Sequence, residues 1–111
     1  MPPTNLGDLQ QLTMLALLRL GEDAYGSRIR EELRGVAGRN LSISAIYVTL
    51  VRLEEQGMVT SHYGDAPARG GRSRRCFGVT PPGLDALQAS REAANRMWSG
   101  LDAHLTKESA P

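Results

Sequence analysis

The sequence predicts a mainly α-helical protein with one small β-hairpin and a long helix near its end. Three observations lead to this prediction. Apolar residues recur at helical spacing up to Gly57, they alternate with polar residues in the stretch that follows, and helical spacing returns after Pro81. The 111 residues suffice for one domain with a modest core. We expect that domain over residues 1–80, a separate helix over 81–105 and a flexible tail over 106–111.

Composition limits the class of protein. The net charge is +1 and the pI about 8.0, so any nucleic-acid site must be a local basic patch. Cys76 is the single cysteine, which excludes an internal disulfide and fits a reducing compartment. No apolar run is long enough to span a membrane, and no secretory signal is recognisable. We therefore expect a cytoplasmic protein without a membrane partner.

The sequence offers no convincing active site. His62 and Cys76 face each other only if a hairpin pairs symmetrically about residue 69, and two ligands are too few for a zinc site. No glycine-rich phosphate loop with Lys-Ser/Thr occurs, and no spacing links Ser, His and Asp into a triad. We therefore expect neither an enzyme nor a metal or other cofactor.

The first helix is expected to start at Asp8, with Asp8 as its cap and Gln11 at the reciprocal capping-box position. The helix is apolar nearly all round, which predicts burial on most sides. In so small a domain, such burial suggests that a second chain covers part of it.

The second helix is expected over residues 24–34, with Ile29 and Leu33 facing inward. Tyr25, Ser27 and Arg28 lie at its first turn, where free backbone N–H groups and the positive end of the helix dipole suit a phosphate. The alternative is that Tyr25 belongs partly to the core and Arg28 is merely solvated.

The third helix is expected from Ser42, as its cap, to Gly57, just past its end. Ile46, Leu50 and Leu53 recur at helical spacing and should face the core. The outer side would carry Ser44, Ala45, Tyr47, Val48, Thr49 and Arg52. Because Arg52 is its only charge, this side suits close approach to a polyanion better than a solvated helix face does. Together with the second helix, it predicts a helix-turn-helix.

A hairpin is expected from two strands, 58–63 and 72–80, joined by a loop over 64–71. Residues 69–75 contain four arginines and no acid, and Gly70-Gly71 would let the backbone approach a phosphate or a minor groove. A solubilising charge run is the alternative. A basic hairpin directly after a helix-turn-helix predicts a winged helix, so the expected fold class is a winged helix-turn-helix plus a C-terminal dimerisation helix.

The last helix is expected to begin with Thr80 as its cap and Pro81 in its first turn. An apolar seam follows, formed by Leu84, Leu87, Ala94, Trp98, Leu101 and Leu105. A seam of this spacing on a terminal helix predicts a homodimer interface. The alternative is that the helix packs back on its own domain.

At these positions the chain resembles the PadR family of bacterial transcription regulators. An apolar first helix followed by Tyr-Gly is similar to Leu15-Ala16-Leu17-Leu18 and Tyr25-Gly26. The family's third-helix pattern, Leu-Ser-x-x-x-Ile/Leu-Tyr-x-Thr-Leu-x-Arg-Leu-Glu-x-x-Gly-hydrophobic, is similar to residues 41–59. Its wing pattern, Gly-Gly-Arg-x-Arg/Lys followed by Leu-Thr-x-x-Gly, is similar to residues 70–83. The resemblance spans residues 9–105.

The resemblance implies a homodimeric winged-helix protein that binds double-stranded operator DNA, usually as a repressor. The implied DNA contacts on the helices are Tyr25, Ser42, Ser44, Tyr47, Thr49 and Arg52, and those on the wing are Gly71, Arg72 and Arg74. A two-fold dimer would bind an inverted repeat with half-sites about one helical turn apart. The sequence departs from the family pattern at Val48, Cys76 and Gly78.

The short terminal region resembles the PadR subgroup that includes multidrug-responsive repressors, in which a Trp on the last helix lines a cleft at the dimer interface. This implies that Trp98 stacks on a planar aromatic effector, with Asp102 favouring cations. The alternative is that Trp98 only anchors the dimer. A different class of function also stays open, namely a winged-helix protein-interaction module without an inducer.

Overall fold

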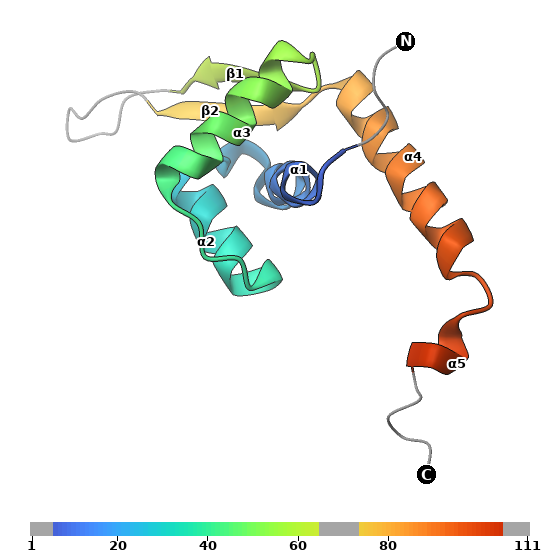
Figure 1. Cartoon of the computed structure of the whole chain (residues 1–111). Coiled ribbons are helices and arrows are strands. Elements are labelled where there is room, and N and C mark those ends of the chain that lie inside the picture. The colour runs from blue at the N-terminus through green and yellow to red at the C-terminus, as the bar shows by residue number, and fades with distance from the viewer. Residues whose placement is uncertain (1–5, 65–73, 106–111) are drawn as a thin grey trace.

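The computed structural model describes residues 6–64 and 74–105. It contains α1 (Asp8–Leu20), a 3₁₀ turn (Gly21–Asp23), α2 (Gly26–Ala37), α3 (Ile43–Glu55), β1 (Val59–Tyr63), β2 (Arg75–Val79), α4 (Pro81–Trp98) and α5 (Asp102–Leu105). Helices α1, α2 and α3 gather beneath the hairpin, while α4 leaves the end of β2 and runs away from them (Figure 1). The expected fold class, mainly helical with one antiparallel hairpin, is confirmed. The expected tail over 106–111, with Gly71 and Arg72 of the wing, lies outside the described residues.

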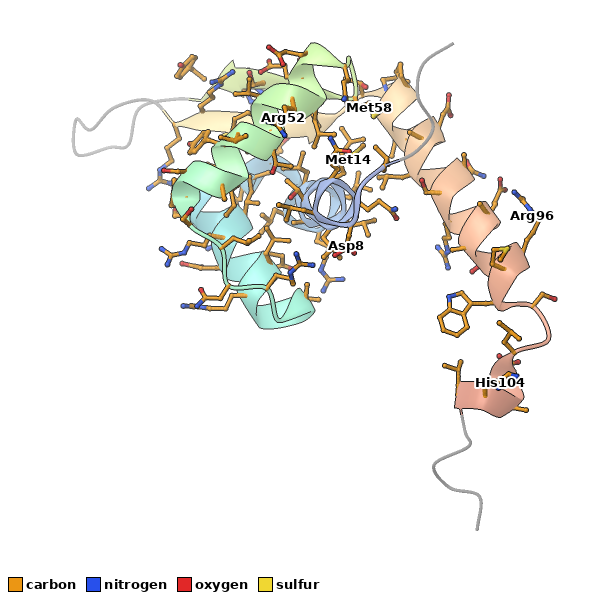
Figure 2. The ribbon with its side chains drawn as sticks, in the orientation of Figure 1. Asp8, Met14, Arg52, Met58, Arg96 and His104 are labelled. Carbon is orange, nitrogen blue, oxygen red and sulfur yellow. The ribbon has the colours of Figure 1, made fainter. Side chains whose placement is uncertain are left out.

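The core lies between α1, α2, α3 and the inner side of the hairpin. Met14 of α1 and Phe77 of β2 are almost completely buried. Each of the first three helices adds residues at helical spacing, and these are Leu17, Ile29, Leu33, Ile46, Leu50 and Leu53. Met14 of α1 and Met58, just before β1, lie near each other in this core (Figure 2). The inward stripes predicted for α2 and α3 are therefore confirmed.

Helix starts follow local capping chemistry, with one correction. Ser42 Oγ accepts a hydrogen bond from the Ala45 amide at 3.1 Å, and Thr80 Oγ1 accepts one from the Gly83 amide at 3.1 Å, as expected. The expected cap at Asp8 is wrong by one residue. Gly7 is the cap, and its amide donates to Gln10 Oε1 at 3.1 Å. The Asp8 carboxylate instead pairs with Arg39.

The second helix begins at Gly26 rather than at residue 24, because the residues before it are extended and pair with the hairpin. Tyr25 forms a β-bridge with Cys76, and the Phe77 amide donates to the Ala24 carbonyl oxygen at 2.9 Å. A backbone pairing between distant segments therefore outweighs the local preference for helix. It connects the start of α2 directly to β2.

The two strands pair from Val59 opposite Val79 to Tyr63 opposite Arg75. His62 faces Cys76 in this register, so the hairpin pairs symmetrically about residue 69. Within the described segments, no group of three His, Cys, Asp or Glu side chains lies close enough together to hold a metal ion.

The terminal region is not one helix over 81–105. Helix α4 ends at Trp98, Ser99 and Gly100 form a turn, and Gly100 adopts a φ of 83° that suits glycine. The four-residue α5 follows. Arg96 and His104 mark how far this region extends from the α1–α3 body (Figure 2). None of the described helices combines the length and apolar character that crossing a bilayer needs.

Candidate nucleic-acid interface

The outer face of α3 is short, polar and almost uncharged. Ser44, Val48 and Arg52 follow one another at four-residue spacing and are exposed. Between Ile43 and Val51 the helix carries no charged side chain. Ser42 caps the N-terminal end of α3 and is also exposed. Over residues 43–51 the face can thus approach base edges and phosphates without electrostatic repulsion from an acid.

Thr49 corrects the sequence-based prediction, which placed it on this outer face. It is only 8% exposed, and its hydroxyl donates to the Ala45 carbonyl oxygen at 3.0 Å. The reason is helical geometry, because position 49 falls on the same side as the buried Ile46, Leu50 and Leu53. Thr49 is therefore nearly buried, and its polar group is satisfied within α3.

Tyr47 connects α3 to the start of α2. Its ring packs edge-on against Phe77, with centroids 5.9 Å apart. A Cβ at Gly26 would lie 3.0 Å from Tyr47 Cε2 and 3.0 Å from Tyr47 Oη, so the ring lies close against the backbone of α2. A side chain at position 26 would require the Tyr47 ring to move by a few tenths of an ångström, so glycine favours this close approach. The half-buried ring fixes where the Tyr47 hydroxyl can lie.

Four residues that the sequence predicted as DNA contacts meet in one cleft. We call it the tyrosine cleft; it is lined by Tyr25, Gly26, Ser27, Tyr47, Tyr63, Arg74 and Arg75, and its volume is about 630 Å³. The Arg74 guanidinium stacks over the Tyr25 ring at 4.4 Å from its centroid. The start of α2 adds its free amides, because Tyr25 as cap makes no side-chain bond to them. Hydroxyls, a guanidinium and a helix N-terminus together suit an anionic oxygen.

Tyr63 and Arg28 show the limits of the sequence-based prediction. Tyr63 was not predicted as a site residue, but it is 70% exposed and lines the tyrosine cleft. The only sequence signal is its place at the end of the first strand, just before the basic loop. Arg28 is exposed on α2, as expected, but does not line the cleft.

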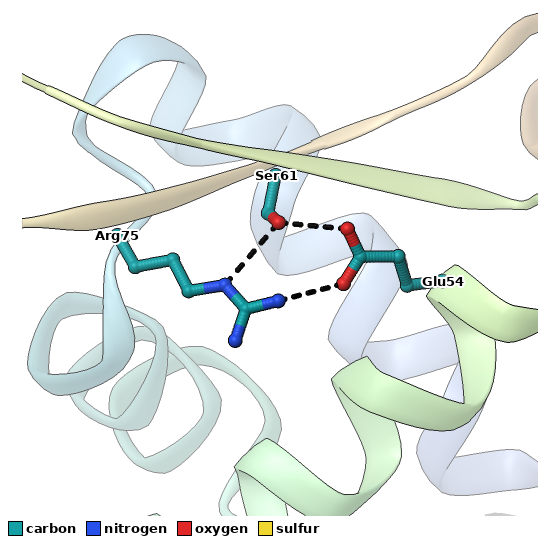
Figure 3. A network of polar contacts seen from close by, with 3 residues as sticks. All are labelled: Glu54, Ser61 and Arg75. Atoms are coloured by element: carbon teal, nitrogen blue, oxygen red, sulfur yellow. Dashed lines mark hydrogen bonds and ion pairs between the residues drawn. The ribbon is translucent and has the colours of Figure 1, made fainter.

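A polar network connects the C-terminal end of α3 to both strands (Figure 3). Arg75 Nη2 donates to Glu54 Oε1 at 2.8 Å, and Arg75 Nε donates to Ser61 Oγ at 3.2 Å. Ser61 Oγ in turn donates to Glu54 Oε2 at 2.7 Å. The Arg75 guanidinium also lies 5.1 Å from the centroid of the Phe77 ring. Arg75 is therefore held by hydrogen bonds and an ion pair within the protein, whereas Arg74 stacks on the Tyr25 ring.

A second surface lies between α1 and α4. This α1–α4 groove has a volume of about 850 Å³, and its lining includes Leu15, Leu18, Leu84, Leu87, Ala94 and Trp98. Leu15, Leu18, Leu84 and Trp98 are exposed although they are large and apolar. Leu101 and Leu105 of the predicted seam are exposed as well, beyond the groove.

The start of α4 packs on its own domain, in agreement with the alternative prediction for the last helix. Leu87 is 9% exposed and belongs to the core, together with Ala86. From Arg91 to Leu105, in contrast, every residue is exposed. Trp98 is 51% exposed, and Asp102 begins α5 and does not line the groove. The structure thus brings Trp98, but not Asp102, to the α1–α4 groove.

Comparison with known proteins gives a consistent result. The family model described as the transcriptional regulator PadR-like family matches residues 14–89. The solved structure of a PadR family transcription regulator from hypervirulent Clostridium difficile R20291 is 22% identical, with a TM-score of 0.73, over 89% of this chain and 99% of that chain. A PadR family transcriptional regulator from Eggerthella lenta DSM 2243 is 27% identical, with a TM-score of 0.67, over 88% of this chain and 86% of that chain. A search among curated proteins gave no match.

Proposed function

Because the chain belongs to the PadR-like family of transcriptional regulators, we propose that it is a repressor that binds an inverted-repeat operator as a homodimer. Membership of this family also means that it is a transcription regulator and not an enzyme. The observation that best supports DNA binding is the position of the tyrosine cleft beside the outer face of α3, whose residues 43–51 carry no charge. We place this activity in the cytoplasm.

In this proposal α3 enters the major groove and the tyrosine cleft receives a phosphate of the DNA backbone. Ser42, Ser44 and Arg52 lie on the exposed side of α3. Tyr25, Ser27, Tyr47 and Arg74 contribute hydroxyls and one positive charge to the cleft. Arg28 contacts the backbone nearby, and the DNA contacts proposed for Gly71 and Arg72 fall outside the described residues. Phosphate contacts fix the register, and base contacts from α3 provide sequence specificity.

The exposed apolar surface supports the dimer. Leu15, Leu18 and Trp98 line the α1–α4 groove, and Leu84, Ala94, Leu101 and Leu105 continue the seam. A second copy would cover these side chains and remove their apolar area from water. Two-fold symmetry then places two copies of α3 in successive major grooves, about 34–36 Å apart.

We further propose that the α1–α4 groove, completed by the second copy, receives a planar aromatic effector that releases the repressor from DNA. Trp98 supplies an aromatic face in a largely apolar lining. Asp102 lies outside this lining, so in this proposal the second copy brings it to the groove, where its carboxylate favours a cationic compound. Titration with a panel of planar aromatic dyes should quench Trp98 fluorescence, since it is the only Trp. Absence of quenching in a confirmed dimer would make Trp98 a dimer anchor only.

DNA binding is tested by fluorescence anisotropy with the chain's own upstream region, at rising salt and against random DNA. Affinity should fall steeply with salt because phosphate contacts release counterions. Arg74→Ala should weaken binding to all sequences and lower the salt slope by about 1 for each phosphate that the variant no longer neutralises. Arg34→Ala, in the last turn of α2, is the matched control and should change neither quantity. Unchanged binding by the Arg74 variant would rule out its wing role.

The alternative is a winged-helix module that binds another protein through its terminal region. The exposed α4 surface is compatible with it. A chain that is monomeric in solution and associates only with a different protein, without binding DNA, would favour this alternative.

A further inference from the structure

Val48 is an exposed apolar side chain in the middle of the outer face of α3. It is 52% exposed, although the helix buries its apolar residues Ile46, Leu50 and Leu53 completely. Most other large exposed apolar residues lie on α1, α4 and α5. The apolar character of Val48 therefore serves neither the core nor the α1–α4 groove.

The neighbours of Val48 form an ordered stripe. Ser44 precedes it by four residues and Arg52 follows it by four, so the three side chains follow one line along α3. A hydroxyl, an apolar group and a guanidinium thus succeed one another from the capped end of the helix. Val51, the other exposed valine of α3, is less exposed, at 40%, and lies off this line.

In the major groove, thymine is the only base that presents an apolar group, its 5-methyl. Hydroxyl and guanidinium groups form hydrogen bonds with the donors and acceptors of the base edges. An aliphatic side chain instead makes a favourable apolar contact with that methyl group. The N-terminal part of a recognition helix is the part that contacts base edges, and Val48 lies in the second turn of α3. We propose that Val48 contacts the 5-methyl group of one thymine in each operator half-site and is a specificity-determining residue. This inference rests on the proposed DNA-binding function.

The test begins with duplexes selected from random DNA by the purified full-length protein. In the selected operator each thymine is replaced in turn by deoxyuridine, symmetrically in both half-sites, which removes one methyl group and preserves base pairing. Wild-type protein should lose about fourfold in affinity per half-site at one thymine position, and about fifteenfold for the symmetric pair. Other thymine positions should change affinity by less than about twofold.

Val48→Ser identifies the side chain responsible. The variant should bind the thymine and deoxyuridine operators equally, because the methyl group has lost its apolar partner. Val36→Ser makes the same change at an exposed valine of α2 and should retain the wild-type preference for thymine. Circular dichroism should give superimposable spectra for all three proteins, since both valines are exposed.

The outcomes separate this inference from the function on which it rests. Specific binding with no thymine position sensitive to deoxyuridine, or an equal loss in Val48→Ser, would overturn the role of Val48 and leave the DNA-binding regulator intact. Failure to select any duplex, with a folded dimer, would overturn both proposals. A methyl-dependent loss confined to proteins that carry Val48 would support the inference.

Discussion

Gly83→Ala is expected to disturb the junction between α4 and the hairpin more than any other exchange of a glycine for alanine in the described chain. A Cβ at position 83 would lie 2.2 Å from the Met58 carbonyl oxygen, 2.8 Å from Val79 Cγ1 and 3.0 Å from Met14 Cε. The nearest atom belongs to the backbone and cannot rotate away. The same Met58 oxygen accepts the Thr80 amide at 3.0 Å, so a displacement of the carbonyl also strains that hydrogen bond.

The size of the effect follows from two opposing contributions. The overlap of about 1 Å with a backbone atom resembles overpacking, which costs about 1–3 kcal/mol and occasionally more. Alanine in place of glycine within a helix recovers at most about 1 kcal/mol, and less in a first turn. We expect a net loss of about 2 kcal/mol, which for a domain of this size lowers the melting temperature by about 10 °C.

Thermal and urea unfolding followed by circular dichroism, at one fixed protein concentration, measures this loss. Gly35→Ala is the matched control, because Gly35 lies inside α2 and its Cβ would meet no atom within 4 Å. That variant should gain about 0.5–1 kcal/mol from helix propensity and reduced freedom of the unfolded chain. Equal stability of the two variants would refute the reasoning from the Gly83 contacts.

Three further predictions concern the interface and the dimer. Replacing Glu54 and Arg75 by Gln, singly and together, should give a coupling energy of about 1 kcal/mol in urea unfolding. This coupling should be smaller in 1 M salt, because the pair is partly exposed. If the two losses of stability are additive, the pair contributes nothing. Tyr47→Phe should keep the melting temperature within about 2 °C, because the packing of the ring is preserved. The variant should bind the operator about tenfold more weakly in anisotropy titrations, because the tyrosine cleft loses a hydroxyl. Unchanged affinity would show that Tyr47 does not contact the DNA. Leu18→Asp should give a folded monomer in analytical ultracentrifugation, because a charge in the α1–α4 groove opposes burial by a second copy. If the variant is still a dimer, the interface lies elsewhere.

Features set by neighbours in sequence were predictable. Ser42 and Thr80 cap helices through amides three residues away, so the residue type and the following apolar pattern were sufficient. Gly7 was missed because glycine offers no side-chain acceptor, while Asp8 carries the usual capping group. The ion pair between Asp8 and Arg39, which occupies that carboxylate, joins residues distant in the sequence.

The remaining differences depend on tertiary contacts or on small angular differences. The extended Ala24–Tyr25 segment is fixed by pairing with Cys76 and Phe77, which a local pattern does not reveal. Thr49 lies at the border between a polar and an apolar face. Its hydroxyl donates a hydrogen bond to the Ala45 carbonyl oxygen, so the side chain can be buried. Tyr25, Ser27, Tyr47 and Arg74 of the tyrosine cleft were predicted as site residues, whereas the inclusion of Tyr63 follows only from the way the hairpin lies beside α2.

Because Gly83 packs closely against the hairpin, the start of α4 is held in place and α4 can act as a lever that pivots there. Its 18 residues span about 27 Å, so a tilt of about 10° at the pivot moves its far end by about 5 Å. That displacement exceeds the 3.4 Å rise of one base pair. In the proposed dimer, a small molecule bound near Trp98 that tilts α4 would therefore change the distance between the two copies of α3 by more than the rise of one base pair. The structure of α1–α3 and the hairpin in each copy would stay the same.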